Sequence, residues 1–354
     1  MDTLFTRLGG RLSELAPDLA TGLVPMAALF DATAAPPAAL IALLAMVLEA
    51  GLGRRVWFFA ALPTPAAMLR ATAGSLGRRL DREGRGRRTL VMRGLIVTML
   101  VGGVAGVLAT VIALAGGRLA YGWLLETVAL ASLVGQRASL AAARHVRQAA
   151  LGGRGLARAY AAVSGRPPAR RDDHGIQREA VEDLATGFAL RVVAVLFWYL
   201  LLGLAGAFVY VAVLETVAAL RRGPGPAKLI AAAPAALLEA VAFVPARLAG
   251  LIMALASLSV PTTNPWRAFR VLARESHGHS SRLAGWPLAA TAGALGLSLA
   301  GPWQTATAAG KEPWIGQGGR ARAEPADLRR AAWLFAVSCL VTAALVAATG
   351  MIAA

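Results

Sequence analysis

Residues 94–117, GLIVTMLVGGVAGVLATVIALAGG, contain no charged side chain. About 20 consecutive apolar residues are enough for a helix to cross the hydrocarbon core of a bilayer. This stretch is therefore long and apolar enough to span a membrane. Arg93 stands directly before it and Arg118 directly after it, so charged residues mark both ends of the predicted span.

The composition of the whole chain is that of a membrane protein. Of its 354 residues, 57% are hydrophobic and 16% are charged, whereas a soluble domain carries about 25% charged residues. The net charge of +17 comes mainly from arginines in short segments between apolar runs, which is typical of cytoplasmic loops. Aromatic residues are few and no helix-turn-helix or zinc-finger spacing occurs, so we expect no nucleic-acid partner.

Further apolar runs predict more spanning helices: residues 119–136, 192–220, 283–301 and 331–354. Gly203 and Gly206 favour a bend in the second of these runs. The third is rich in the small residues of closely packed membrane helices. We therefore predict an all-α, polytopic integral membrane protein with about four to six transmembrane helices.

Two other apolar regions are less regular. Residues 38–53 are short and interrupted by Glu49, so a span, an interfacial helix and a packed helix all remain open. Residues 229–260 are broken by prolines and by Glu239. Such a segment is a poor lipid-exposed span and is better suited to line a buried or polar cavity.

The chain divides into an N-terminal segment, residues 1–36, and a membrane domain, residues 37–354. The first has no apolar core followed by a small-residue cleavage site, so we do not interpret it as a cleaved signal peptide. The positive-inside rule predicts a multi-pass protein of the bacterial inner membrane, with membrane lipids as partners. Four basic or polar segments are the expected cytoplasmic loops: about 54–93, 137–186, 261–282 and 302–330.

General catalytic motifs are missing from the sequence. No Walker-type phosphate loop, HExxH or GxSxG occurs, and glycines 102, 103 and 106 lie inside an apolar run, which favours helix packing. The single cysteine, Cys339, excludes a disulfide within the chain. His277 and His279 lie close together without an evident third ligand, so we expect no metal site built on histidines.

Short motifs carry a more specific signal. They follow one another as Arg178-Glu179-Ala180-Val181-Glu182, Leu196-Phe197-Trp198-Tyr199, Pro245-Ala246-Arg247-Leu248, Ala284-Gly285-Trp286-Pro287, Gly301-Pro302 and Pro313-Trp314-Ile315-Gly316. In this order and spacing the chain resembles the CobD/CbiB family of cobalamin biosynthesis, from about Leu119 to the C-terminus and more weakly from Leu40. The resemblance implies a ligase that joins aminopropanol, or its phosphate, to the corrinoid adenosylcobyric acid with ATP and Mg²⁺.

The resemblance also implies site residues. Mg²⁺ takes oxygen ligands such as carboxylates, phosphates are bound by Arg or Lys, and the attacking amine needs a base. Three glutamates are the catalytic candidates: Glu182, Glu215 and Glu239. Three other residues are candidates for substrate binding: Arg178, Arg247 and Trp286.

Each of these residues has a structural alternative. A carboxylate beside apolar segments needs a polar partner, so ion pairs with Arg178, Arg191 or Arg247 would account for the three glutamates. An arginine beside an apolar segment can also extend its charged end to water. Tryptophans are common at membrane interfaces, which would account for Trp286.

Several acidic positions of the family are replaced here. The corresponding segments are Ser164-Gly165-Arg166-Pro167, Glu215-Thr216-Val217-Ala218 and Leu238-Glu239-Ala240-Val241. These losses keep a second hypothesis open, in which the protein is a non-catalytic relative that binds a corrinoid, assists other membrane enzymes of the pathway, or serves in signalling. A transporter is disfavoured, because the chain has neither paired broken helices nor an internal repeat.

Overall fold

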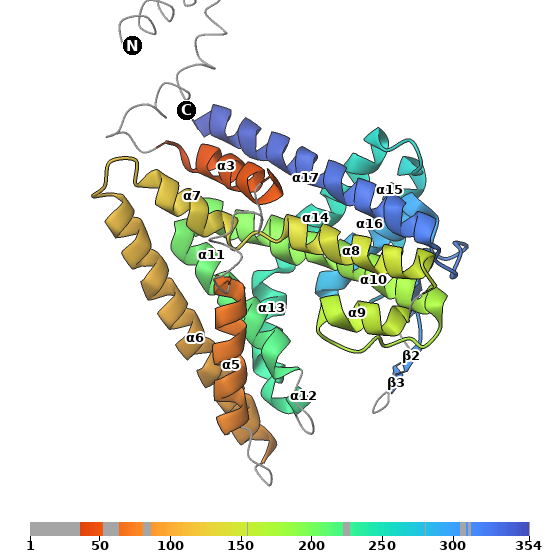
Figure 1. Ribbon diagram of the computed structural model, residues 1–354, viewed down its shortest axis with the longest axis horizontal. Coiled ribbons are helices and arrows are strands. Elements are labelled where there is room, and N and C mark those ends of the chain that lie inside the picture. Colours follow the sequence, from red (N-terminus) through yellow and green to blue (C-terminus); the bar gives the residue numbers. More distant parts are fainter. Residues whose placement is uncertain are drawn as a thin grey trace, which may run out of the picture.

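The computed structural model describes residues 36–51, 64–80, 86–153, 155–221, 227–279, 281–304, 309–310 and 313–353. The N-terminal segment predicted for residues 1–36 lies outside this part of the chain, except for Pro36. The described residues are mostly helical (Figure 1).

The helices of the first half are α3 (Ala38–Gly51), α5 (Pro65–Leu80), α6 (Arg87–Gly116), α7 (Trp123–Ala131), α8 (Gln136–Leu151), α9 (Leu156–Ser164) and α10 (Asp173–Phe188). A short π-helix, η2 (Ala189–Val193), leads into α11 (Ala194–Leu220). The remaining helices are α12 (Ala227–Ile230), α13 (Ala232–Val241), α14 (Phe243–Ala256), the 3₁₀ turn η3 (Ser257–Ser259), α15 (Pro265–Glu275), α16 (Arg282–Leu295) and α17 (Pro325–Ala353).

Three described helices are long and apolar enough to cross a membrane: α6, the continuous helix Asp173–Leu220 and α17. A fourth span results if α13 and the helix Phe243–Ser259, which meet at an angle of 55°, count as one broken span. The prediction of an all-α protein with several membrane-spanning helices is therefore confirmed. The number of candidate spans reaches four, the lower end of the predicted range of four to six, only if the broken pair is counted as one span.

Two predicted spans form shorter helices. Residues 119–136 contain α7, which has 9 residues, and residues 283–301 contain most of α16, which has 14. Neither reaches the length that a bilayer requires. Before α7 the chain turns sharply. Gly116 and Gly122 lie so close together in this turn that a Cβ on Gly122 would be 1.8 Å from the Gly116 carbonyl oxygen. α16 ends at Gly296, which has a left-handed conformation with φ of 70°.

The expected loops contain helices as well. α5 lies in the segment predicted as a loop at residues 54–93, and α15 lies in the loop predicted at residues 261–282. α15 is amphipathic, buries Ala268, Val271 and Leu272, and begins at Asn264, whose side chain accepts a hydrogen bond from the Arg267 backbone N–H at 3.0 Å. These polar segments are thus folded against the apolar helices.

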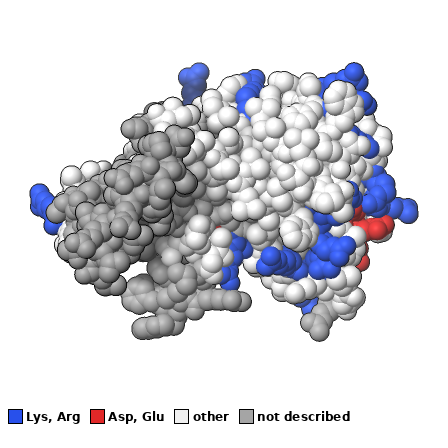
Figure 2. Space-filling view, turned by 90° about the horizontal axis from the view of Figure 1, so that it is seen from above, with Lys and Arg blue, Asp and Glu red and all other residues white. Residues whose placement is uncertain are grey.

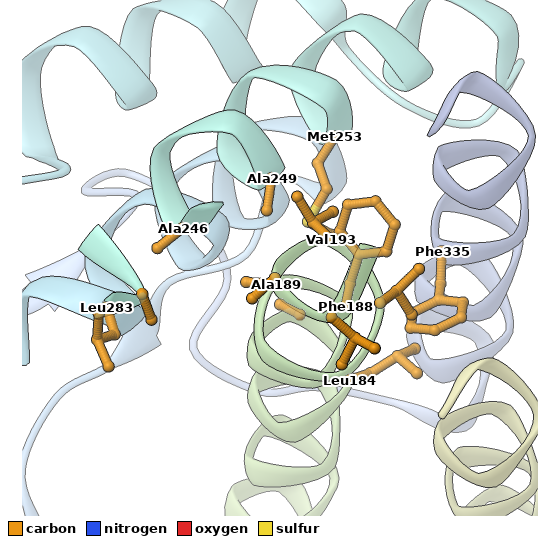
Figure 3. Close-up of a cluster of buried hydrophobic side chains, with 14 of the residues drawn as sticks. Leu184, Phe188, Ala189, Val193, Ala246, Ala249, Met253, Leu283 and Phe335 are labelled. Carbon is orange, nitrogen blue, oxygen red and sulfur yellow. The ribbon is translucent and has the colours of Figure 1, made fainter. Parts of the chain in front are cut away.

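The long helix Asp173–Leu220 bends where the sequence predicts. Gly203 has φ of 65° and ψ of −161°, a conformation that is open essentially to glycine alone. Nearer its start, the helix passes through η2 and packs Phe188 against Phe335 of α17, with the ring centres 5.6 Å apart. Figure 3 shows this buried cluster, in which residues of α10 and η2 meet Ala249 and Met253 of α14.

The outer surface of α6 is apolar. Its exposed large residues are Met92, Leu95, Ile96, Met99, Leu100, Val104, Val107, Leu108, Val111 and Leu114. On the face shown in Figure 2, a broad area lacks charged side chains and most Lys and Arg residues lie at its margins. An uncharged surface bordered by cations is the pattern of a protein embedded in a membrane.

The described residues between α16 and α17 form four very short strands. β1 (Leu299–Ala300) pairs with β4 (Trp314–Ile315), and β2 (Trp303–Gln304) pairs with β3 (Ala309–Gly310), both antiparallel. Trp314 packs on the backbone of Gly301, where an added Cβ would lie 2.7 Å from the indole ring. The two-stranded pairs therefore form a tight turn beside the helices.

Candidate functional site

The central candidate is a buried contact between α10 and the β1–β4 turn, and Glu182 holds it together. One Glu182 oxygen, Oε2, accepts a hydrogen bond from Nη1 of Arg170 at 2.9 Å. The other, Oε1, accepts from the Ala300 backbone N–H at 2.8 Å. Arg170 also donates to the Ala300 carbonyl oxygen at 2.5 Å. The glutamate and the arginine thus bind both backbone groups of one residue in the turn.

Ala300 adopts an unusual backbone conformation in this contact. Its φ is 58°, which is uncommon for a residue with a Cβ, and the next residue, Gly301, has φ of 77°. The hydrogen bonds from Arg170 and to Glu182 offset the cost of this geometry. The arrangement therefore fixes the shape of the turn.

Arg178 and Trp314 complete the same contact. The Arg178 guanidinium lies 4.7 Å from the centre of the Trp314 ring, and its Nη1 donates to the Ala321 carbonyl oxygen at 2.7 Å. Its Nε lies 3.9 Å from Glu182 Oε1. The motif at residues 178–182 and the motif at residues 313–316 thus come together although they are far apart in the sequence.

A second polar cluster joins α9 to α10. The Tyr160 hydroxyl shares its single proton between a Glu179 oxygen at 3.0 Å and an Asp183 oxygen at 2.5 Å, while Arg166 forms ion pairs with both carboxylates. Burial and the nearby Asp183 raise the pKa of Tyr160 above its usual value, so the hydroxyl remains a donor. Burial alone would lower the pKa of Arg166, but Asp183, Tyr160 and Glu179 raise it.

Glu215 lies in a third place. Its carboxylate is fully buried in α11 and accepts hydrogen bonds from Arg191 at 2.8 Å and from Arg70 of α5. The structural alternative, an ion pair with Arg191, is therefore present. Arg70 is a partner that the sequence did not suggest.

Arg247 and Trp286 come together in a fourth place. The Arg247 guanidinium lies 5.4 Å from the centre of the Trp286 ring. Glu239, on the half-buried side of α13, forms no hydrogen bond or ion pair within the described residues. None of the three arginines offered as structural partners thus pairs with Glu239, and the six predicted site residues lie in separate groups.

Two of the three predicted catalytic glutamates have no carboxylate oxygen left for a Mg²⁺ ion. Both oxygens of Glu182 and both oxygens of Glu215 are occupied by arginines or by a backbone N–H. Within the described part of the chain, no three His, Cys, Asp or Glu side chains come together as a metal site. Glu182 and Glu215 as arranged therefore do not fit a directly bound Mg²⁺ ion.

Sequence reasoning missed several residues of these clusters: Tyr160, Arg166, Arg170, Glu179 and Asp183. A signal for two of them was available, because Glu179 and Asp183 are four residues apart and share a helix face. Arg170 lies in a stretch that is rich in arginine, and nothing in its neighbours marks it as the partner of Glu182. Only the fold brings the turn at Ala300 to that arginine.

Comparisons with known proteins lead to the same family as the motifs do. The profile of the family described as CobD/Cbib protein matches residues 42–335. The Cobalamin biosynthesis protein CobD of Sinorhizobium sp is 34% identical over 324 residues, which cover 88% of this chain and 98% of that protein. The protein of the same name from Rhizobium meliloti (strain 1021) is 34% identical over 313 residues, covering 85% and 94%.

A third relative of this name, from Sinorhizobium fredii, is 32% identical over 317 residues, covering 86% of this chain and 94% of its own length. No solved structure matches the chain. The family profile and the relatives both extend over most of the sequence, including the segments that meet around Glu182. This chain belongs to the CobD/Cbib family of cobalamin biosynthesis proteins.

Proposed function

We propose that this protein is a multi-pass enzyme of the bacterial inner membrane. Its reaction would join aminopropanol, or aminopropanol phosphate, to adenosylcobyric acid and so form adenosylcobinamide or its phosphate. An amide bond forms between the amine and a corrin carboxylate, which must first be activated, and ATP with Mg²⁺ would enter as co-substrates for that activation. The substrate is thus a corrinoid, and other membrane enzymes of the pathway are expected partners.

One observation supports the proposal most. Arg178 and Glu182 meet Trp314 and the Ala300 turn in one buried, hydrogen-bonded unit, and these segments carry the motifs by which the chain resembles the family. Arg170 and Arg178 together bring two positive charges to one carboxylate. This end of α10 is therefore suited to face an anionic substrate such as a corrin acid or a phosphate.

Roles of individual residues follow from their partners. Glu182 would act as a positioning residue, because both of its oxygens hold other groups. Glu215 would likewise position α5 against α11. Glu239 has no partner within the described residues, so among the three glutamates it is our candidate for the general base.

Growth of a bacterium that lacks its CobD/CbiB protein tests this function. We expect the gene to restore cobalamin-dependent growth and both Glu239→Gln and Arg178→Gln to abolish it, while Glu324→Gln, at an exposed ion pair, retains it. Absence of growth from well-expressed, membrane-inserted wild-type protein would contradict the proposal.

A second function is supported by the same carboxylates. Because arginines occupy Glu182 and Glu215 and several acidic family positions are replaced, a non-catalytic relative that binds a corrinoid is the alternative. In that case the gene would fail to restore growth, yet the purified protein would bind adenosylcobyric acid. The growth assay separates the two functions, and equilibrium binding measured by the corrin absorbance separates the second function from a protein that binds no corrinoid.

A further inference from the structure

Two arginines meet where α14 passes the beginning of α16. Their neighbours in the sequence, Ala246 and Leu283, belong to one buried cluster (Figure 3). The helices are close there, because a Cβ added to Gly250 would lie 3.0 Å from the Trp286 backbone. Arg282 lies four residues before Trp286 on the same face of α16, and the Trp286 ring centre is 5.4 Å from the Arg247 guanidinium.

Neither arginine is neutralised within the described part of the chain. Arg247 donates to the Phe243 carbonyl oxygen at 3.0 Å, and its guanidinium lies 3.3 Å from the centre of the Phe243 ring. Arg282 has no hydrogen bond or ion pair there. The acid of the preceding helix, Glu275, accepts instead from backbone N–H groups of residues 316 and 317, at 2.7 and 3.2 Å.

The surroundings make this positive charge costly. Val244, Leu248 and Leu251 of α14 are exposed apolar residues, as expected for a helix that contacts lipid, and a cation beside lipid without a counter-ion is unfavourable. The Trp286 indole N–H is also buried and has no acceptor within the described residues. Two cations and one unpaired donor therefore lie on this side of the two helices, and no acidic side chain of the described residues pairs with them.

We propose that Arg247, Arg282 and the Trp286 indole N–H form a binding site for a phosphate group. A guanidinium offers paired donors that match phosphate oxygens, and two guanidinium groups balance the double charge of a phosphate monoester. The packing of Arg247 on Phe243 holds one of these groups in place before binding. His277, whose ring centre lies 5.9 Å from that of Trp286, borders the site.

The site adds a place for a phosphate group to the proposed function. It rests on the proposed function if the phosphate belongs to a soluble substrate, and is independent of it if the phosphate belongs to a lipid. A soluble phosphate, such as that of an amino alcohol or a nucleotide, and the phosphate of an anionic lipid headgroup share the required chemistry. The location between a polar loop and the lipid-facing side of α14 admits both sources. The lipid phosphodiester carries one negative charge and a phosphate monoester up to two, and both offer oxygens that guanidinium groups bind.

The site is tested by measuring binding and not catalysis. The result therefore does not depend on whether the protein is an active ligase. The full-length protein in neutral detergent is titrated with inorganic phosphate by calorimetry, and its retention of phosphatidylglycerol is measured by native mass spectrometry. We expect Arg282→Gln and Arg247→Gln each to weaken binding by about tenfold or more, because each removes a charge-assisted hydrogen bond. Trp286→Phe should weaken it less.

The control is Arg270→Gln, an exposed arginine of α15 that stacks on Trp266. It should bind like the wild type. If phosphatidylglycerol displaces inorganic phosphate, the lipid headgroup is the ligand. If saturation with this lipid leaves the binding of inorganic phosphate unchanged, the ligand is a soluble phosphate. The proposal is overturned if the wild type binds neither probe, or if Arg247→Gln and Arg282→Gln bind as well as Arg270→Gln.

Discussion

Glu182 is the residue on which the contact between α10 and the β1–β4 turn depends most. It neutralises Arg170, whose side chain is 6% exposed, and it also binds the Ala300 N–H. A buried arginine that loses its carboxylate keeps the cost of its desolvation without the compensating attraction. The energetic role of Glu182 is thus larger than that of an ordinary surface ion pair.

Replacement of this glutamate therefore has a predictable effect on stability. We expect Glu182→Ala to lower the free energy of unfolding by about 3 kcal/mol, because it leaves Arg170 buried and unpaired. Thermal unfolding of the detergent-purified protein, followed by circular dichroism, measures the change. Glu324→Ala is the matched control, since it breaks an ion pair whose two side chains are 51% and 55% exposed and which contributes less than about 1 kcal/mol. Equal effects of the two changes would contradict this reading.

Glu215 and its two arginines connect helices rather than loops. Arg70 of α5 and Arg191 of η2 both bind the same buried carboxylate. The sequence indicates that Glu215 needs a polar partner, and Arg191 was among the suggested ones. It does not indicate Arg70, because only the fold of α5 against α11 brings that side chain within reach.

At the scale of elements, the bend of α11 at Gly203 is the most constrained feature. The φ and ψ angles of this residue lie in a region that other residues avoid. We expect Gly203→Ala to lower the free energy of unfolding by about 1–3 kcal/mol, since the bend must then be strained or straightened. Urea unfolding in detergent, followed by tryptophan fluorescence, measures the change.

Gly103 of α6 supplies the control for the Gly203 variant. An added Cβ at Gly103 meets nothing within 4 Å, and alanine is favoured over glycine inside a helix by about 1 kcal/mol. Gly103→Ala should therefore leave stability unchanged or raise it. A loss of stability at Gly103 as large as that at Gly203 would show that the backbone angle is not the cause.

The long apolar helices could be predicted from sequence, and the short ones could not. Residues 94–116 lie in α6 and residues 331–353 lie in α17, because an uncharged run of spanning length has few other stable arrangements. Residues 119–136 and 283–301 are apolar too, yet α7 and α16 are short, and most of α16 is buried within the protein. A run of apolar residues does not tell a lipid-facing helix from a buried one.

The residues of the candidate site could be predicted from the sequence only in part. The motifs at residues 178–182 and 313–316 were found in the sequence, but their contact through Glu182, Ala300 and Arg178 depends on the path of the chain between α16 and α17. Arg247 and Trp286 were both expected to bind substrate, and the structure brings them together. Their separation from Glu182 and Glu215 was not predictable from spacing.

At the scale of the whole molecule, the orientation of α6 follows from the charges at its ends. Its first turns carry Arg87, Arg88 and Arg93, whereas Arg118 follows its last turn. The positive-inside rule therefore predicts that the beginning of α6 faces the cytoplasm. The proposed multi-pass arrangement then places Arg118 on the opposite side.

Cysteine labelling tests this orientation. After Cys339, which is buried, is replaced by alanine, cysteines are introduced as Arg88→Cys and Arg118→Cys in separate variants. A membrane-impermeant thiol reagent should label the second variant in intact spheroplasts and the first one only after permeabilisation. Labelling of Arg88→Cys in intact spheroplasts would show that the beginning of α6 faces away from the cytoplasm and would contradict the predicted orientation.

The most direct test of the proposed ligase uses the protein reconstituted in liposomes. Adenosylcobyric acid, aminopropanol phosphate and ATP with Mg²⁺ are supplied, and adenosylcobinamide phosphate is measured by mass spectrometry. We expect the wild type and Glu324→Gln to form this amide, and Arg178→Gln and Glu239→Gln not to form it. Correctly folded, membrane-inserted wild-type protein that forms no amide would contradict the proposed ligase activity.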